Sequence, residues 1–462
     1  MTAPTPLPGA EDTIAAIATA RGRSALAVVR LSGPEARRIG AAVLTPFHAE
    51  AGRAFLAELR SPAGGATIDR VIATSFHAPR SFTGEEMLEL TTHGGLIVPA
   101  LALEALLAAG AREALPGEFT RRAVANGKLD LLQAEAAADL VDARSPAMHR
   151  AALRQLEGGL TSRVGALRES VLALEALLAY ELDFPEEDDG PLPRREVGAR
   201  VAQLRAELDT LLASARTGEI VRDGAVVVLA GPPNSGKSSL FNALVGSARA
   251  IVTDIPGTTR DALEATIEIA EWPVRLVDTA GLREGGADIV EQLGIEVTHR
   301  YLARADLVLL CGESPELLAR ARRGIAALRS VPTLAVWTKS DLVPQGDLNS
   351  IAPEPAAPIP VSARTGAGLG ALGDAIAATL VRLHPVADGA AVLLTRERHR
   401  RGVERAREEI AAFITGWEAG ELPAPVLAVH LRAAGSALEE LIGVVEREDV
   451  LDVVFRTFCI GK

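Results

Sequence analysis

The sequence is poor in cysteine and in net positive charge. Its 462 residues contain two cysteines, Cys311 and Cys459, which lie far apart in the chain. They supply neither a disulfide framework nor the ligand spacing of a metal site, which fits a reducing cytosol. Asp and Glu number 60 against 48 Lys and Arg, so the formal net charge is −12. This acidity argues against a general nucleic-acid coat, which needs a dense positive field, but it leaves room for a local basic groove.

Signals for secretion and for membrane insertion are missing as well. The stretch MTAPTPLPGAEDTIAA lacks a basic region followed by an apolar one, so we expect no signal peptide. The longest apolar stretch, residues 96–111, contains Glu104 and is shorter than the ~20 residues of a membrane span. We therefore expect a cytoplasmic globular protein without a membrane partner. Its length suggests about three domains at ~150 residues each.

Lysine is almost absent. It occurs at Lys128, Lys237, Lys339 and Lys462, and every other basic side chain is Arg or His. If a general drift from Lys to Arg replaced lysine wherever any cation suffices, the remaining lysines mark positions that need a compact ammonium group on a flexible stem. Chance retention is the alternative for any one of them.

The hydrophobic pattern changes three times along the chain. Short β-like runs and one helical stretch in residues 11–125 indicate an α+β domain. Apolar residues then recur every three or four positions over residues 153–178, which predicts one long amphipathic helix. From residue 225, buried-strand runs alternate with helical segments, as in a doubly wound α/β domain, and after His384 the helical pattern returns. The predicted architecture is an N-terminal α+β domain (1–127), a discontinuous helical domain (128–222 and 385–462) and an α/β domain (223–384) inserted into it.

A phosphate-binding motif follows the first strand of the α/β domain. The segment from Gly231 to Ser238, GPPNSGKS, matches G-x-x-x-x-G-K-[ST], and a helix-like run follows it. In this motif glycines let backbone N–H groups surround the phosphates, Lys237 reaches the β and γ oxygens, and the Ser238 hydroxyl binds Mg²⁺. The motif and its context together disfavour a strand–turn–helix without a ligand. The predicted contacts of a nucleoside triphosphate here are Asn234, Ser235, Gly236, Lys237, Ser238 and Ser239.

Three later segments indicate that the base is guanine. Residues 278–281 (DTAG) end a strand where a carboxylate would hold the metal and a glycine would sense the γ-phosphate. Residues 338–341 (TKSD) resemble the N-K-x-D guanine signature, whose Asp accepts hydrogen bonds from guanine N1–H and the 2-amino group. Thr338 departs from the usual Asn there, but Asp341 is retained. The chain thus resembles a Ras-like GTPase over residues 225–382, with further predicted contacts at Asp278, Thr279, Ala280, Gly281, Thr338, Lys339, Asp341, Ser362 and Ala363.

The residue after DTAG is Leu282, where a Ras-like enzyme has a water-orienting Gln. Another group must therefore orient water, and another cation must stabilise the developing charge. Asn234 and residues 253–261 resemble the potassium-dependent GTPases that dimerise through their G domains. That resemblance implies that K⁺ is held by Asn234, Thr253, Ile255 and Thr258, and that Thr259 is the second protein ligand of Mg²⁺.

Several further blocks carry a resemblance over essentially the whole chain. They are DTIAAIAT, SFTGEEMLELTTHGG, PGEFTRRAVANGKLDLLQAEA and the C-terminal FCIGK. Together with a helical domain interrupted by a G domain, they resemble the MnmE (TrmE) family of tRNA uridine-modification GTPases. The resemblance implies an N-terminal domain that forms a homodimer and binds 5-formyl- or 5,10-methylene-tetrahydrofolate. It further implies that, with the flavin- and NADH-dependent partner MnmG, the protein adds an aminomethyl or carboxymethylaminomethyl group to C5 of the wobble uridine of certain tRNAs.

The same resemblance assigns site residues. The folate contacts would be Arg30, Glu89, Lys128 and Lys462, so all four lysines of the chain fall in functional motifs. Glu291 aligns with the family's catalytic glutamate, but the loop is one residue longer than expected, which leaves Glu284 as a competitor. Cys459 is either a nucleophile for the one-carbon chemistry or a thiol that packs beside the folate. The rival function is a GTP-dependent ribosome-assembly switch, which explains the G domain but neither the N-terminal block nor the C-terminal C-x-G-K.

Overall fold

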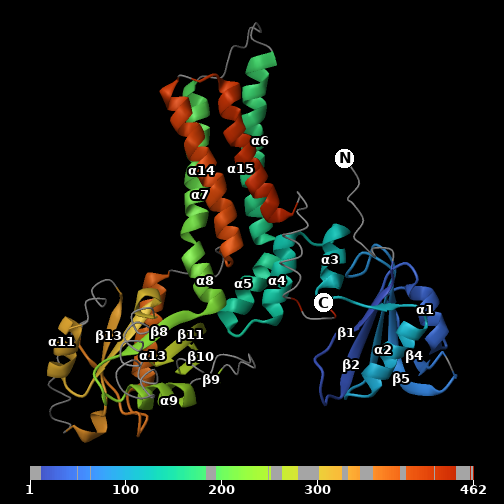
Figure 1. Ribbon diagram of the computed structural model, residues 1–462, viewed down its shortest axis with the longest axis horizontal. Coiled ribbons are helices and arrows are strands. Elements are labelled where there is room, and N and C mark those ends of the chain that lie inside the picture. The colour runs from blue at the N-terminus through green and yellow to red at the C-terminus, as the bar shows by residue number, and fades with distance from the viewer. Residues whose placement is uncertain are drawn as a thin grey trace, which may run out of the picture. The chain divides into compact units, whose positions relative to one another are not determined.

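The computed structural model describes most of the chain (Figure 1). The described residues are 12–48, 50–62, 64–183, 194–247, 249–250, 263–278, 301–324, 331–343, 357–384, 392–420, 422–443, 458 and 461. The chain divides into two compact units, unit 1 (Met1–Ala138, Leu156–Arg168 and Gly435–Lys462) and unit 2 (Asp139–Gln155 and Glu169–Ala434). No described helix combines the length and the apolar character that a bilayer crossing requires.

Unit 1 is built on a seven-stranded sheet in the order β3-β4-β5-β6-β2-β1-β7. Neighbouring strands are antiparallel, except that β1 and β7 run parallel. Hydrophobic residues alternate along the strands and face helices α1 (Ala36–Val43) and α2 (Val98–Ala108), where Val29, Leu31 and Leu106 are buried in one core. The strands are β1 (Ile14–Ile17), β2 (Leu26–Ser32), β3 (Leu44–Thr45), β4 (Ala54–Arg60), β5 (Thr67–Phe76), β6 (Met87–His93) and β7 (Arg112–Glu113). This is the predicted α+β domain.

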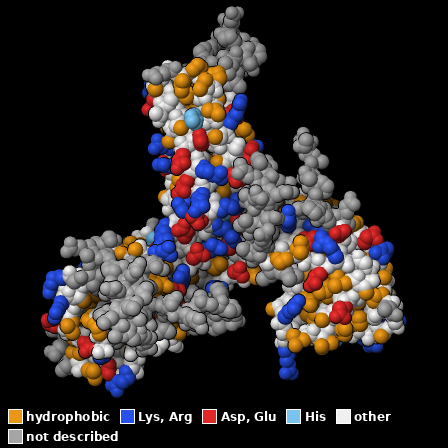
Figure 2. Space-filling view, in the orientation of Figure 1, with side chains coloured by type: hydrophobic (Ala, Val, Ile, Leu, Met, Phe, Trp, Pro, Cys, Tyr) orange, Lys and Arg blue, Asp and Glu red, His pale blue; other side chains and the backbone are white. Residues whose placement is uncertain are grey.

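The opposite face of this sheet is covered only in part. Phe119 of helix α3 (Glu118–Ala125) packs with Ile14 of β1. Further along the sheet, Leu56 and Ile72 are paired neighbours on β4 and β5, and these residues are 66% and 50% exposed. Hydrophobic side chains are prominent on the visible face of unit 1 (Figure 2).

The long amphipathic helix predicted over residues 153–178 is instead two helices. Helix α5 (Pro146–Leu156) ends before Gly158, which has a φ of 88° and turns the chain into α6 (Gly159–Asp183). A left-handed glycine interrupts the helical hydrogen bonds although the hydrophobic spacing continues past it. The other long helices follow the predicted pattern, with buried side chains every three or four residues on α7 (Arg194–Ala213) and α14 (Glu397–Ala419). Elements α4 (Leu131–Val141), α8 (Ala215–Asp223) and α15 (Ala424–Ile442) complete the described helical part.

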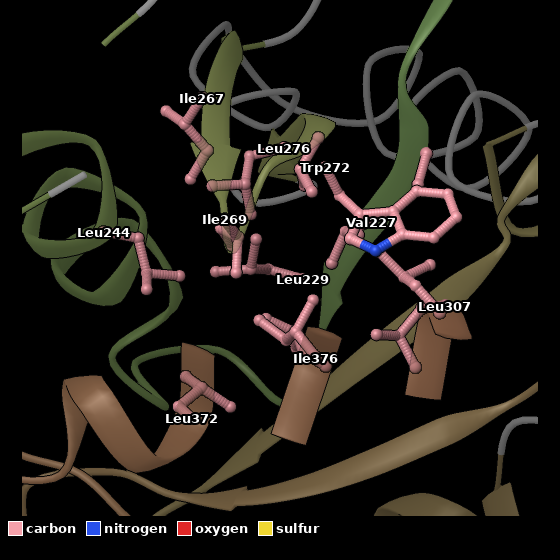
Figure 3. Packing of buried hydrophobic residues seen from close by; sticks show 14 of the residues in the cluster. Val227, Leu229, Leu244, Ile267, Ile269, Trp272, Leu276, Leu307, Leu372 and Ile376 are labelled. Carbon is pink, nitrogen blue, oxygen red and sulfur yellow. The ribbon is translucent and has the colours of Figure 1, made fainter. Parts of the chain in front are cut away.

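Unit 2 contains the predicted doubly wound domain, whose seven-stranded sheet has the order β14-β13-β12-β8-β11-β10-β9. The first five strands of this order are parallel, while β10 and β9 extend the sheet with antiparallel pairing. Apolar side chains of β8, β10 and β11 pack against the helices on one face, as Figure 3 shows for Val227, Ile267, Leu276, Leu372 and Ile376. The elements are β8 (Ala225–Ala230), α9 (Lys237–Ser247), β9 (Arg249–Ala250), β10 (Leu263–Ile269), β11 (Trp272–Asp278), β12 (Leu307–Gly312), α11 (Pro315–Gly324), β13 (Thr333–Trp337), the 3-10 turn η3 (Ser340–Leu342), β14 (Ile359–Pro360) and α13 (Leu369–Leu383).

A buried carboxylate holds the two segments that lead into and out of this sheet domain. Asp139 accepts hydrogen bonds from Arg222 Nε (3.3 Å) on α8 and from Arg396 Nη2 (2.6 Å), the residue before α14. Close beside them, a Cβ on Gly218 of α8 would lie 2.2 Å from the carbonyl oxygen of Leu394. Glycine is therefore required where α8 meets the segment that returns from the sheet domain.

Candidate functional site

The loop between β8 and α9 has the backbone of a phosphate cradle. Gly231, Asn234 and Gly236 have positive φ values of 146°, 62° and 79°. A Cβ on Gly231 would lie 2.3 Å from the carbonyl oxygen of Cys311, so only glycine fits there. Such loops turn successive backbone N–H groups inward, and the positive end of the following helix dipole favours an anion at the same place.

Three polar side chains lie at this loop. Lys237, the first residue of α9, is buried and donates hydrogen bonds to the carbonyl oxygens of Gly231 (3.1 Å) and Pro232 (2.8 Å). Ser235 Oγ is buried and has no hydrogen-bond partner among the described residues, although such groups are normally paired. Asp278 is fully buried at the end of β11, the strand that runs parallel to β8. The buried cation and the unpartnered hydroxyl fit a phosphate group, and a carboxylate at this strand end fits a hydrated Mg²⁺.

Cys311 lies behind the loop, on β12. Burial raises the pKa of its thiol to about 12, the charge of Lys237 opposes this rise, and the charge of Asp278 adds to it. A thiol with this pKa carries almost no thiolate at neutral pH. Cys311 is therefore a structural residue and not a nucleophile.

A cavity of about 390 Å³ opens beside the loop and holds the residues predicted to recognise the base. Thr338 lies at its inner end, where its hydroxyl is within hydrogen-bond distance of the carbonyl oxygens of Ser235 (2.8 Å) and Gly312 (3.1 Å). The hydrogen bond to Ser235 links the end of β13 to the phosphate loop. Thr338, which stands where the guanine signature usually has Asn, therefore holds the base cavity and the phosphate loop together. The cavity is lined by Gly236, Ser239, Leu240, Thr338, Lys339, Asp341, Leu342, Val361, Ala363 and Arg364.

Asp341 lies at the wall of this cavity as a well-ionised acceptor. Its Oδ1 accepts a hydrogen bond from Ser362 Oγ (2.7 Å), and its Oδ2 accepts one from Arg364 Nε (2.9 Å). The hydrogen bond from Ser362, with the hydrogen bond and charge of Arg364, holds the pKa of the Asp341 carboxyl below its usual range. Lys339 Nζ donates to the carbonyl oxygen of Asn234 (3.1 Å) and forms an ion pair with Glu313, which links the base cavity to the phosphate loop a second time.

A second set of predicted residues meets on the partly open face of unit 1. Arg30 on β2 and Glu89 on β6 are register partners, and Arg30 Nε donates to Glu89 Oε1 at 2.8 Å. The guanidinium of Arg30 lies 5.5 Å from the ring centre of Phe82. Lys128 Nζ donates to the carbonyl oxygen of Pro79 (3.0 Å), in the segment that leads to Phe82.

The described C-terminal residues lie on the same unit. Phe458 is buried with Leu131 and Ala134 of α4. A Cβ on Gly461 would lie 2.5 Å from the carbonyl oxygen of Ile17, the last residue of β1, so Gly461 packs directly against the end of this strand. Ile17 is the register partner of Val29 on β2, the residue before Arg30.

The structure thus joins Arg30 to Glu89, and Thr338 and Lys339 to the phosphate loop, whereas Lys128 bonds to the carbonyl of Pro79. Phe82 and Arg364 are additional candidates that the sequence analysis missed. The aromatic in SFTGEE and the position after Ser362-Ala363 were the available signals. Among the described residues no group of three or more His, Cys, Asp or Glu side chains could hold a metal ion. The predicted residues outside the described ranges are Thr253, Ile255, Thr258, Thr259, Thr279, Ala280, Gly281, Glu284, Glu291, Cys459 and Lys462.

Comparisons with known proteins agree on one family. Residues 131–459 match a family model described as the MnmE helical domain, and residues 13–128 match one described as the N-terminus of the GTP-binding protein TrmE. The protein named tRNA modification GTPase MnmE from Ralstonia nicotianae is 43% identical, with 97% of this chain and 96% of that protein covered. The proteins of that name from an Azoarcus species and from Thermus thermophilus are 44% and 43% identical, each with 98% of this chain and 99% of the relative covered.

Among solved structures, the G domain of the T. maritima FeoB iron transporter is 28% identical. The match covers 34% of this chain and 98% of that one, with a TM-score of 0.25.

Proposed function

Because the chain belongs to the MnmE family of tRNA modification GTPases, and is a GTP hydrolase that acts in tRNA modification, we propose the following reaction for it. Its GTPase is activated by K⁺. With the flavin- and NADH-dependent partner MnmG, it uses a tetrahydrofolate one-carbon unit to add a (carboxymethyl)aminomethyl group to C5 of the wobble uridine (U34) of certain tRNAs. The alternative, a ribosome-assembly switch, has no support from the full-length relatives, which are named tRNA modification GTPases.

The nucleotide assignment is supported above all by the contact between the phosphate loop and the base cavity. Thr338 reaches the carbonyl of Ser235, so both predicted parts of one nucleotide site lie on the same unit. When bound, GTP supplies the β and γ phosphates that this chain must hold in line with water. Lys237 would pair with their oxygens, and Asp341 would accept hydrogen bonds from the guanine N1–H and 2-amino groups. Mg²⁺ would be held by Ser238 and Thr259, with Asp278 behind it.

We assign charge stabilisation to K⁺ and water positioning to Glu291. Asn234 would hold K⁺ together with Thr253, Ile255 and Thr258, where the ion would offset charge that develops on the phosphoryl oxygens. Asn234 is exposed in the loop, and its backbone carbonyl accepts a hydrogen bond from Lys339. Its side-chain amide oxygen would be the ligand of K⁺.

The GTPase proposal is tested by hydrolysis rates in KCl and in NaCl. The Asn234→Ala variant should lose the K⁺ stimulation, whereas Asn242→Ala, which removes an exposed amide from α9, should keep it. Glu291→Gln should lower kcat without changing the Kd for GDP. If Glu284→Gln does this instead, Glu284 is the residue that orients water.

The folate proposal is supported by the contacts that join Arg30 to Glu89 and to Phe82, and by the packing of Gly461 against β1 of the same sheet. A carboxylate can accept hydrogen bonds from the amino and ring N–H groups of a pterin, and cations suit the glutamate tail of folate. The partly open sheet face supplies the carboxylate of Glu89, which is paired with Arg30, and the Arg30 guanidinium lies over the Phe82 ring. Lys128 and the C-terminal Lys462 would supply the cations. Cys459 would lie beside the one-carbon unit as nucleophile or as packing.

Calorimetric binding of 5-formyl-tetrahydrofolate to the full chain tests this assignment. Lys128→Ala and Glu89→Gln should both weaken binding, while Arg37→Ala, which removes an exposed cation from α1, should not. No binding by the folded wild-type protein would refute the folate site, and the GTPase would remain.

The exposed apolar residues of unit 1 support the proposed homodimer. Leu56 and Ile72 form a paired row on the open sheet face, and such patches on globular proteins commonly mark interfaces. A Leu56→Asp variant should shift the protein from dimer to monomer in light scattering. A Leu101→Asp variant, which changes an exposed leucine on α2, is the matched control.

A further inference from the structure

The acceptor positions of Asp341 are largely taken by two side chains of this chain. Ser362 Oγ donates to Oδ1 at 2.7 Å. Arg364 directs both Nε (2.9 Å) and Nη2 (2.8 Å) at Oδ2. Asp341 and Arg364 line the base cavity, and fully buried Ser362 contacts Asp341.

A count of acceptor positions shows the conflict with a bound base. An ionised carboxylate offers about four lone-pair positions. Arg364 takes two of them on Oδ2 and Ser362 takes one on Oδ1, so one remains. The guanine edge presents two adjacent donors, N1–H and the 2-amino group, and both need a carboxylate acceptor. Guanine and Arg364 therefore cannot both be fully bound at Asp341.

We propose that Arg364 competes with guanine for Asp341 and so sets the affinity of the cavity for guanine nucleotides. The Nε–H and Nη2–H groups of Arg364 are two parallel donors whose nitrogens are bonded to the same carbon, Cζ. The N1–H and 2-amino groups of guanine have the same arrangement around C2. The Arg364 side chain is 76% exposed and can leave toward solvent, whereas the Asp341 side chain is only 13% exposed and is held by buried Ser362. Guanine binding displaces the arginine and keeps the serine contact.

The size of the effect follows from the exposure of the ion pair. Exposed ion pairs of this kind have small interaction free energies. Removal of the Arg364 side chain should therefore tighten GDP binding about two- to fivefold. Arg364→Lys should give an intermediate affinity, because an ammonium keeps the charge but loses the paired donor geometry.

The experiment is a calorimetric titration of GDP with Mg²⁺ into the full chain. The Arg364→Ala and Arg364→Lys variants are compared with the wild type and with Arg382→Ala, which removes an exposed arginine from α13. Arg382→Ala should bind GDP as the wild type does. Unchanged or weaker GDP binding by Arg364→Ala overturns the proposal, since it would show an idle arginine or one that holds the bound nucleotide.

The inference rests on the proposed role of Asp341, and a double-mutant cycle separates the two. If Arg364 acts through this carboxylate, Arg364→Ala has no effect in an Asp341→Ala background. Tightening of equal size in that background overturns the competition, because the arginine would then act elsewhere. If Asp341→Ala alone binds GDP as tightly as the wild type, the base-recognition role of Asp341 fails.

Discussion

Replacement of Thr338 by valine removes one hydroxyl and nearly preserves the shape of the side chain. The hydroxyl has one proton, and the carbonyl oxygens of Ser235 (2.8 Å) and Gly312 (3.1 Å) are within its reach. Gly312 keeps a partner in the variant, because the backbone N–H of Thr338 also donates to it at 2.9 Å. The Ser235 carbonyl loses its brace, and an unsatisfied buried acceptor costs about 1–3 kcal/mol. Thr338 itself is only 4% exposed, so water does not readily replace the contact.

We expect Thr338→Val to weaken GDP binding at least about fivefold, which corresponds to about 1 kcal/mol. The physical reason is that the base cavity and the phosphate loop lose the contact that holds them in register. The assay is calorimetric titration of GDP with Mg²⁺ into the full chain, with Thr338→Ser as the variant that keeps the hydroxyl.

Thr379→Val is the matched control for this prediction. Thr379 is buried on α13, and its hydroxyl donates to the carbonyl of Ala375 in the same helix (2.8 Å), away from the base cavity. Its loss should leave GDP affinity unchanged. Equal GDP affinities of Thr338→Val and the wild type would refute the proposed role of the Thr338 hydroxyl. A loss of GDP affinity in Thr379→Val as large as that in Thr338→Val would refute it as well.

Three further predictions concern stability and reactivity. Gly218→Ala should destabilise the protein by about 1–3 kcal/mol in chemical unfolding, because its Cβ would meet the Leu394 carbonyl, whereas Gly165→Ala on α6 has open space and should be neutral or stabilising. The pKa of Glu118 is below its ordinary value because hydrogen bonds and charges from neighbouring arginines and a backbone N–H outweigh the opposing effect of burial. Its stabilisation is present above the unfolded pKa of about 4.3 and is lost as pH falls through the lower pKa of the folded state. The free energy of unfolding of Glu118→Gln, measured by chemical unfolding, should therefore depend less on pH below about 4.3 than that of the wild type. Cys311, with its pKa raised to about 12 by burial, should react with iodoacetamide at pH 7 only under unfolding conditions, and rapid native labelling at Cys311 would contradict this.

The elements and motifs that depend on local spacing could be predicted from the sequence. The strand before Gly231, the helix after it and the strand that ends at Asp278 are all formed by short segments with strong hydrophobic patterns. The break at Gly158 was missed because apolar residues keep their helical spacing across it, and only the backbone shows the left-handed turn.

Contacts made across strands could not be read from spacing. Phe82 approaches Arg30 because β2 and β6 pair in a particular register, which no local pattern specifies. Arg364 reaches Asp341 because the segment after β14 folds back toward η3. The family resemblance assigned both Arg30 and Glu89 to the proposed folate site. The structure adds that the two residues are cross-strand partners joined by a hydrogen bond, which the sequence alone could not show.

The shared contact of Arg222 and Arg396 with Asp139 also bears on how such a chain could have arisen. The segment that leads into the sheet domain and the segment that leads out of it both bond to the carboxylate of Asp139. The proposed insert therefore begins and ends at nearly the same point of the helical domain. A segment with adjacent ends can be gained or lost by a single recombination without rerouting the surrounding helices. The packing of α7 against α14 uses only residues outside the proposed insert. The insert nevertheless shares a core with its host, because Met148, Ile220 and Leu393 are buried in one cluster with side chains of β8, β10 and β11.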